Sequence, residues 1–152
     1  MSTQLTFKAV LAKQSDTHKV ISFAATASQI HQFANIDHVA RDSSGTIQGF
    51  QRPQIASHIN EIRDYLEGDD AVLPNPIVVA FTDRAFVEKT EDGSVELRID
   101  TSNGPPGLVV DGQQRLTALS GLSEKDFQVF VSALICRDEE ELRRQFLSLI
   151  HI

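Results

Sequence analysis

The sequence predicts a compact α+β domain in which helices flank the strands of a mixed sheet. Short apolar or alternating runs recur between residues 5 and 135, as they do in β-strands. Two segments, residues 53–68 and 113–122, instead repeat apolar residues at helical spacing. Since strands and helices follow one another in an irregular order, a single mixed domain accounts for both patterns.

The N-terminal segment predicts two strands and a short helix. Residues 5–12 (LTFKAVLA) and 18–25 (HKVISFAA) have strand composition, and a polar turn joins them. Residues 26–36 (TASQIHQFANI) predict a helix with Thr26 or Ser28 as its N-cap. The buried side of this helix is expected to carry Ile30, Phe33 and Ala34.

A loop at residues 41–49 (RDSSGTIQG) precedes a longer amphipathic helix. Pro53 suits the first turn of this helix and Gly68 suits its C-terminal end. Its apolar residues follow one another at steps of four, three and four, so they share one face. They are Ile55, Ile59, Ile62 and Leu66.

The next two elements are strands. Residues 77–81 (IVVAF) form a continuous apolar run, which is typical of a strand covered on both faces. Residues 86–99 predict a hairpin that turns at Asp92 and Gly93.

The C-terminal part predicts two further pairs of a strand and a helix. Residues 108–110 (LVV) form a short strand, and the helix after it ends near Gly121. Residues 127–135 (FQVFVSALI) form a strand, and residues 138–146 (DEEELRRQF) open an acidic helix.

Composition excludes several classes of protein. The net charge of −7 and the pI of about 5.1 argue against a global basic face for nucleic acid, while a local basic pocket stays open. No apolar run approaches the roughly 18 residues that span a bilayer, and the N-terminus lacks a secretory signal. Cys136 is the only cysteine, so no internal disulfide can form, and we expect a cytoplasmic location.

The sequence stops at RRQFLSLIHI, inside a helical pattern and without a cap. We therefore expect residues 1–146 to be one domain of a longer, truncated protein. Residues 147–152 are then a non-native tail. The alternative is a short C-terminal helix that docks on the core.

The residues that carry chemistry lie at 111–115 (DGQQR), where a strand gives way to a helix. Gly112 permits a tight turn and lets a ligand approach the main chain. The first N–H groups of a helix lack internal partners and lie at the positive end of its dipole, so they form an anion site. Arg115 can grip a phosphate with two parallel hydrogen bonds, and the amides of Gln113 and Gln114 can donate or accept.

The same turn also suits a helix that binds no ligand. Asp111 and Gln114 have the spacing of a capping box, with Asp111 as the cap. Arg115 would then be a solvated side chain.

A second amide–arginine pair, Gln51 and Arg52, stands directly before the long amphipathic helix. The positive end of that helix repels an arginine unless an anion lies between them. Arg52 and Arg115 are therefore expected to clamp one polyphosphate from two helix starts. The alternative is an ion pair of Arg52 with a loop carboxylate such as Asp42.

The stretch VVDGQQRLTAL resembles the signature of DGQHR-domain proteins, with Gln114 in place of the usual histidine. It is also similar to the DGQQR form in the N-terminal domain of GmrSD-type restriction enzymes. The order of parts from residue 48 to residue 122 is the same, and residues 138–146 resemble the following helix. Within this group the chain resembles the DndB and DpdB proteins of clusters that install phosphorothioate or 7-deazaguanine in DNA and serve phage defence.

These groups belong to the ParB/sulfiredoxin-like set, in which a Gly-x-x-Arg turn holds nucleotide phosphates, so the resemblance implies a fold of that kind. It implies a nucleoside triphosphate with Mg²⁺ as the ligand, and Asp111 either caps the turn or helps to hold the ion. Asp111 is also the one candidate catalytic residue, which leaves NTPase activity open. The signature positions that carry over are Asp111, Gly112, Gln113 and Arg115, with Gln51 and Arg52 as the upstream pair. Gln114, which departs from the signature, completes the set of candidate phosphate-binding residues.

Two departures limit what the resemblance implies. Gln114 removes an imidazole, so proton transfer at neutral pH is lost from that position. The sulfiredoxin reaction requires a cysteine in the turn, whereas Cys136 lies well outside it and is expected to be a small buried hydrophobe.

The expected function is a nucleotide-phosphate-binding domain of a regulatory or DNA-acting bacterial protein linked to DNA modification, which reaches DNA through the full-length protein. One alternative is the N-terminal domain of a GmrSD-type modification-dependent restriction endonuclease. Another is a non-enzymatic DNA-binding regulator whose turn contacts DNA phosphate directly.

Other kinds of site find little support in the sequence. The five histidines do not have metal-ligand spacing. The sequence contains neither a Walker A loop nor a Gly-x-Ser-x-Gly elbow. The nine phenylalanines sit at core spacing, so they do not predict a base-stacking platform.

Overall fold

The structure is a computed structural model that describes residues 3–14, 18–36, 56–92, 94–122, 127–138 and 140–144. The upstream pair, Gln51 and Arg52, lies outside these residues, as do the loop expected at 41–49 and the segment 147–152.

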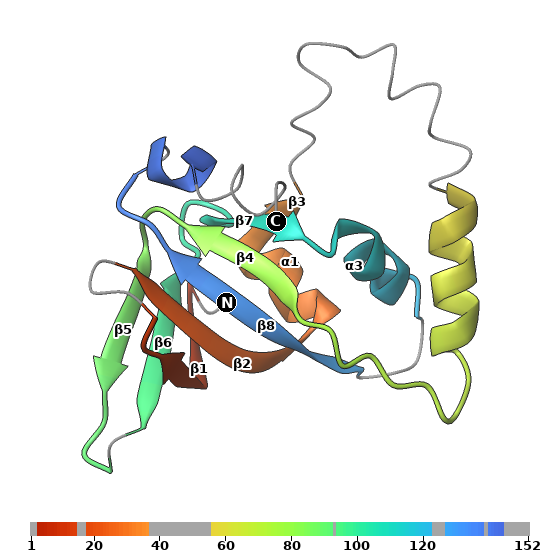
Figure 1. The fold of residues 1–152 in the computed structure, drawn as a ribbon, viewed down its shortest axis with the longest axis horizontal. Coiled ribbons are helices and arrows are strands. Elements are labelled where there is room, and N and C mark those ends of the chain that lie inside the picture. The colour runs from red at the N-terminus through yellow and green to blue at the C-terminus, as the bar shows by residue number, and fades with distance from the viewer. Residues whose placement is uncertain are drawn as a thin grey trace.

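The described strands form one eight-stranded sheet in the order β3-β7-β4-β8-β2-β1-β6-β5 (Figure 1). β3 pairs with β7 and β4 pairs with β8 in parallel, and the other neighbours pair antiparallel. The predicted α+β class with a mixed sheet is therefore confirmed. The strands are β1 (Gln4–Ala12), β2 (Lys19–Thr26), β3 (Ala34–Ile36), β4 (Ile77–Phe81), β5 (Ala85–Lys89), β6 (Val95–Asp100), β7 (Gly107–Asp111) and β8 (Gln128–Ile135).

The first helix, α1 (Ala27–Phe33), begins at Thr26 rather than at Ser28. The backbone N–H of Gln29 donates to Oγ1 of Thr26 at 3.2 Å, and the N–H of Thr26 donates to Oε1 of Gln29 at 2.9 Å. This is a complete capping box. The helix predicted over residues 26–36 ends early, because residues 34–36 form β3 and pair their backbone with β7.

One face of the sheet is buried under α1 and carries a cluster of aromatic rings. The ring of Phe33 lies 5.7 Å from that of Phe7 in β1, 5.8 Å from that of Phe23 in β2 and 5.9 Å from that of Phe81 in β4, between centroids. Such pairs contribute about 1 kcal/mol each beyond the burial of apolar area. These ring contacts hold α1 against the strands, and Figure 1 shows α1 lying behind the sheet.

Two further helices pack against this core. These are α3 (Gln113–Ser120) and the helix of residues 56–66, which is drawn in yellow beside α3 in Figure 1. In helix 56–66, Leu66 is fully buried, and Ile59 and Ile62 pack against the core as their spacing predicts. A Cβ at Gly121 would lie 2.9 Å from Cδ of Arg63, so helix 56–66 also packs against the C-terminal end of α3.

β7 begins at Gly107, where three neighbours approach the backbone. A Cβ at this position would lie 2.8 Å from the carbonyl oxygen of Phe33, 2.8 Å from Cε1 of Phe81 and 2.9 Å from Cγ1 of Val79. A glycine is therefore what allows β7 to fit between β3 and β4.

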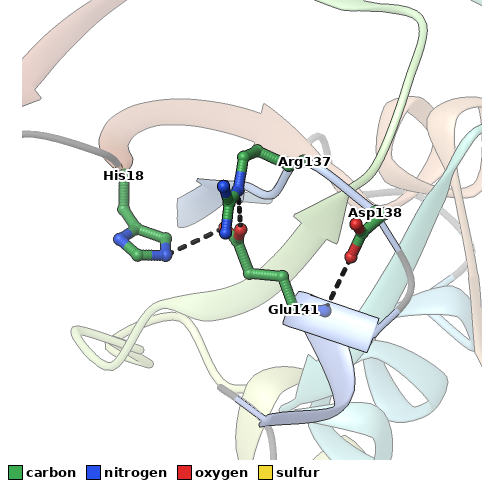
Figure 2. Close-up of polar contacts among 4 residues, drawn as sticks. All are labelled: His18, Arg137, Asp138 and Glu141. Carbon is green, nitrogen blue, oxygen red and sulfur yellow. Dashed lines mark hydrogen bonds and ion pairs between the residues drawn. The ribbon is translucent and has the colours of Figure 1, made fainter.

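A buried carboxylate ties the C-terminal helical residues 140–144 to the sheet (Figure 2). Glu141 is 2% exposed, accepts a hydrogen bond from Nε of Arg137 at 2.6 Å and lies 2.9 Å from Nε2 of His18. Its backbone N–H donates to Oδ1 of Asp138 at 2.9 Å. The hydrogen bond from Arg137 is the main reason why the pKa of Glu141 lies below its ordinary value.

We predict that Gly107→Ala lowers the free energy of unfolding by about 2 kcal/mol, because the carbonyl of Phe33 cannot move out of the way of a new methyl group. Urea unfolding of both proteins measures the change. The matched control is Gly104→Ala, since Gly104 has a φ of +96° but nothing within 4 Å of its Cβ position. The control loses about 1 kcal/mol from backbone strain alone. Equal losses in the two variants would contradict the close packing of β7.

We predict that Glu141→Gln destabilises the fold at neutral pH and flattens its response to acid. The pKa of Glu141 is lowered in the folded state, so its contribution is present above the ordinary value of 4.5 and is lost as the pH falls through the folded pKa. Urea unfolding between about pH 7 and pH 3 should show a smaller acid-induced loss in the variant. A residual loss should remain, because Asp92 and Asp100 also have lowered pKa values.

The control for this prediction is Glu61→Gln, since the carboxylate of Glu61 is exposed and lies 4.0 Å from Nδ1 of His58. Its pH profile should match that of the wild type. An identical profile for the Glu141 variant would show that the ion pairs in Figure 2 do not stabilise the fold.

Candidate functional site

The turn between β7 and α3 differs from the predicted capping box. Asp111 is the last residue of β7, and Gly112 is the N-cap of α3, with φ of 94° and ψ of 19°. The predicted cap by Asp111 and the capping box with Gln114 are therefore wrong, because the helix begins one residue later than the spacing requires. No side chain caps this helix start, which leaves its first N–H groups for a ligand or water.

Two features restrict position 112 to glycine: the backbone conformation there and the close approach of neighbouring side chains. Its φ lies in the left-handed region that favours glycine. A Cβ there would also lie 2.8 Å from Cδ1 of Ile77 and 3.0 Å from Nη2 of Arg115. The turn therefore keeps its main chain open to approach only while residue 112 is glycine.

Arg115 connects the turn to the loop that precedes β4. Its Nη1 donates to the carbonyl oxygen of Asn75 at 2.8 Å and to that of Pro76 at 3.1 Å. Its Nη2 lies 3.7 Å from Oδ2 of Asp111, and the side chain is 19% exposed. Arg115 is thus a structural link as well as a cation beside the helix start, and the alternative of a purely solvated arginine does not match this geometry.

An open cleft of about 540 Å³ lies between this turn and helix 56–66. All five residues predicted in the turn line it: Asp111, Gly112, Gln113, Gln114 and Arg115. The opposite wall consists of His58, Glu61, Ile62, Tyr65 and Leu73. The structure therefore brings the DGQQR residues together on one cavity, while the predicted approach of Gln51 and Arg52 falls outside the described residues.

The sequence interpretation missed the wall that helix 56–66 contributes. His58, Glu61 and Tyr65 repeat at helical spacing, beside the apolar stripe to which Ile62 belongs. That spacing could have identified a second face of the helix, although nothing local indicates that this face lies opposite the turn.

The charges of the cleft do not favour a bare anion. Asp111 is 69% exposed, and Glu61 is a second exposed carboxylate on the opposite wall, so two negative groups accompany Arg115. A polyphosphate that carries Mg²⁺ would reduce this repulsion, because Mg²⁺ binds one or two carboxylates together with phosphate oxygens. Among the described residues no three His, Cys, Asp or Glu side chains form a metal site, so an ion would need the phosphates as ligands.

Cys136 lies outside the cleft, and its environment agrees with the prediction of a buried hydrophobe. The residue is 4% exposed, and its backbone N–H donates to the carbonyl of Phe81 at 2.8 Å. Burial, followed by the nearby carboxylates of Glu141 and Asp138, raises the pKa of the Cys136 thiol to about 11.

A model of the DndB family, described as DNA-sulfur modification-associated, matches residues 7–149. This match confirms the DndB-like resemblance, and it covers the whole cleft and all of the sheet except the first three residues of β1. No curated protein and no solved structure matches the chain. Within the part of the chain that the structure describes, no helix is both long enough and apolar enough to cross a membrane.

We predict that Arg115→Ala lowers the free energy of unfolding by about 2 kcal/mol, because it removes a charged donor from two backbone carbonyls. Urea unfolding measures the loss. The control is Arg98→Ala, which breaks an exposed ion pair of 2.8 Å with Glu88 and should cost about 1 kcal/mol or less. If the two variants lose the same stability, the contacts of Arg115 with the loop do not hold the cleft together.

Proposed function

The chain belongs to the DndB family of DNA-sulfur modification-associated proteins, and we propose that its part in that process is to bind a nucleoside triphosphate. The observation that carries the proposal is the cleft at the start of α3. An uncapped helix start, a left-handed glycine and an arginine lie there on one cavity of about 540 Å³.

The phosphates would lie against the first turn of α3. The N–H groups of Gln113 and Gln114 follow the N-cap, where the dipole of the helix favours negative charge. Nη1 of Arg115 is already used by two carbonyls, so its Nη2 and Nε groups would hold the phosphate. Gln51 and Arg52 would add a second amide and a second cation.

The carboxylate of Asp111 would face a Mg²⁺ ion carried by the phosphates. Its exposure and its position at the end of β7 support this role, since a hydrated ion requires an accessible oxygen. Asp111 is also the candidate catalytic residue if the nucleotide is hydrolysed. The ion would supply charge neutralisation between the phosphates and the two carboxylates of the cleft.

We place this site in a regulatory or DNA-acting protein whose state depends on nucleotide binding, with control of DNA modification and phage defence as the output. DNA would be reached through the full-length protein. The net charge of −7 argues against direct DNA binding by these residues, which is why nucleotide binding is preferred to a DNA-binding regulator.

We predict that Gln114→Glu weakens the binding of ATP, GTP or CTP about tenfold while it raises the stability of the fold slightly. The substitution keeps the shape of the side chain and places a negative charge in the first turn of α3. A carboxylate stabilises that end of a helix by about 0.5 kcal/mol but repels a phosphate bound there. Calorimetric titration with and without Mg²⁺, together with urea unfolding, measures both effects.

Weaker nucleotide binding together with a higher stability of the fold would show that Gln114 acts in binding, because a substitution that damages the fold lowers both. The control is Gln128→Glu, the same change at an exposed position of β8 that does not line the cleft. Its nucleotide affinity should equal that of the wild type. Unchanged affinity in the Gln114 variant, or DNA binding that ignores nucleotide and falls steeply with salt, would contradict the proposed function.

A further inference from the structure

Tyr65 is the only tyrosine in the sequence, and it lies on the wall of the cleft that faces the DGQQR turn. Its hydroxyl donates to the carbonyl of Val72 at 3.1 Å and accepts from the N–H of the same residue at 3.1 Å. The side chain is nevertheless 53% exposed. Two hydrogen bonds therefore hold the hydroxyl in place, while much of the side chain is exposed to solvent.

The two sides of the cleft differ in chemistry. The turn contributes polar and charged groups. The opposite side includes His58 and Glu61, but it also contributes apolar surface, from Ile62, Tyr65 and Leu73. Inorganic phosphate or a sugar–phosphate backbone would use only the polar side. A ligand that fills both sides carries a phosphate at one end and a flat apolar group at the other.

We infer that Tyr65 is the residue on which the base of the bound nucleotide stacks, an inference that rests on the proposed function. Aromatic side chains bind bases through their π-faces, and every nucleobase presents such a face. The hydrogen bonds of the hydroxyl hold the ring in place before the ligand arrives, which reduces the loss of side-chain freedom on binding. Tyr65 therefore makes the site prefer a nucleotide to a bare polyphosphate.

The experiment compares ATP with inorganic tripolyphosphate, both with Mg²⁺, by calorimetric titration of the 152-residue chain. The wild type should bind ATP about tenfold more tightly than tripolyphosphate, as expected for one stacked base. Tyr65→Leu should lose this preference and keep its affinity for tripolyphosphate. Tyr65→Phe should retain most of the preference, because it keeps the ring and loses only the hydrogen bonds with Val72 that hold the ring in place.

The chain also contains its own spectroscopic reporter. It has one tyrosine and no tryptophan, so its intrinsic emission, apart from the weak signal of the phenylalanines at shorter wavelength, comes from Tyr65. Stacking of a base should quench this emission, whereas tripolyphosphate should leave it unchanged. Free N-acetyltyrosinamide corrects for light absorbed by the nucleotide, and Phe86→Leu, which alters an exposed aromatic in β5 outside the cleft, is the matched control variant.

Each outcome has a defined meaning. Equal binding of ATP and tripolyphosphate by the wild type, or an unchanged preference in Tyr65→Leu, would overturn the stacking role and leave the phosphate site standing. Loss of the preference in both Tyr65→Leu and Tyr65→Phe would also overturn it, since the hydroxyl and not the ring would then be responsible. Binding of neither ligand by the wild type would overturn the proposed function and this inference together.

Discussion

The packing of Phe33 is the constraint on which the arrangement of the domain depends. Its ring contacts phenylalanines from β1, β2 and β4, so the end of α1 is held over the middle of the sheet. The next residue, Ala34, begins β3. This strand pairs in parallel with β7, starting with Ala34 opposite Gly107, and the pairing sets the position of β7. Because β7 runs directly into the DGQQR turn, a buried aromatic contact positions a polar site that it does not touch.

Much of this fold could be predicted from local patterns. The strands β1, β2, β4, β7 and β8 follow apolar runs, and the hairpin of β5 and β6 follows its turn residues. The capping box at Thr26 is also a local signal. β3 could not be predicted in this way, because three residues become a strand only through a partner that lies far along the chain.

The candidate site likewise has one part that the sequence predicts and one part that only the fold shows. Its turn could be found from the sequence because glycine, amides and arginine are contiguous there, whereas the start of α3 at Gly112 depends on backbone angles that no composition fixes. The contacts of Arg115 with Asn75 and Pro76 join residues 40 and 39 positions apart. The wall from helix 56–66 is likewise a product of tertiary packing. Spacing identifies the chemistry of single elements, and only the fold shows which elements share a cavity.

The environment of Cys136 bears on the sulfur chemistry that the family description names. Enzymes that pass sulfur between molecules hold it as a persulfide on a cysteine, and only an accessible thiolate can accept it. The single thiol of these 152 residues is buried, and its pKa of about 11 keeps it protonated at neutral pH. In the described fold, then, the thiol of Cys136 is a packing group directly after β8 and is not presented to solvent as a sulfur acceptor.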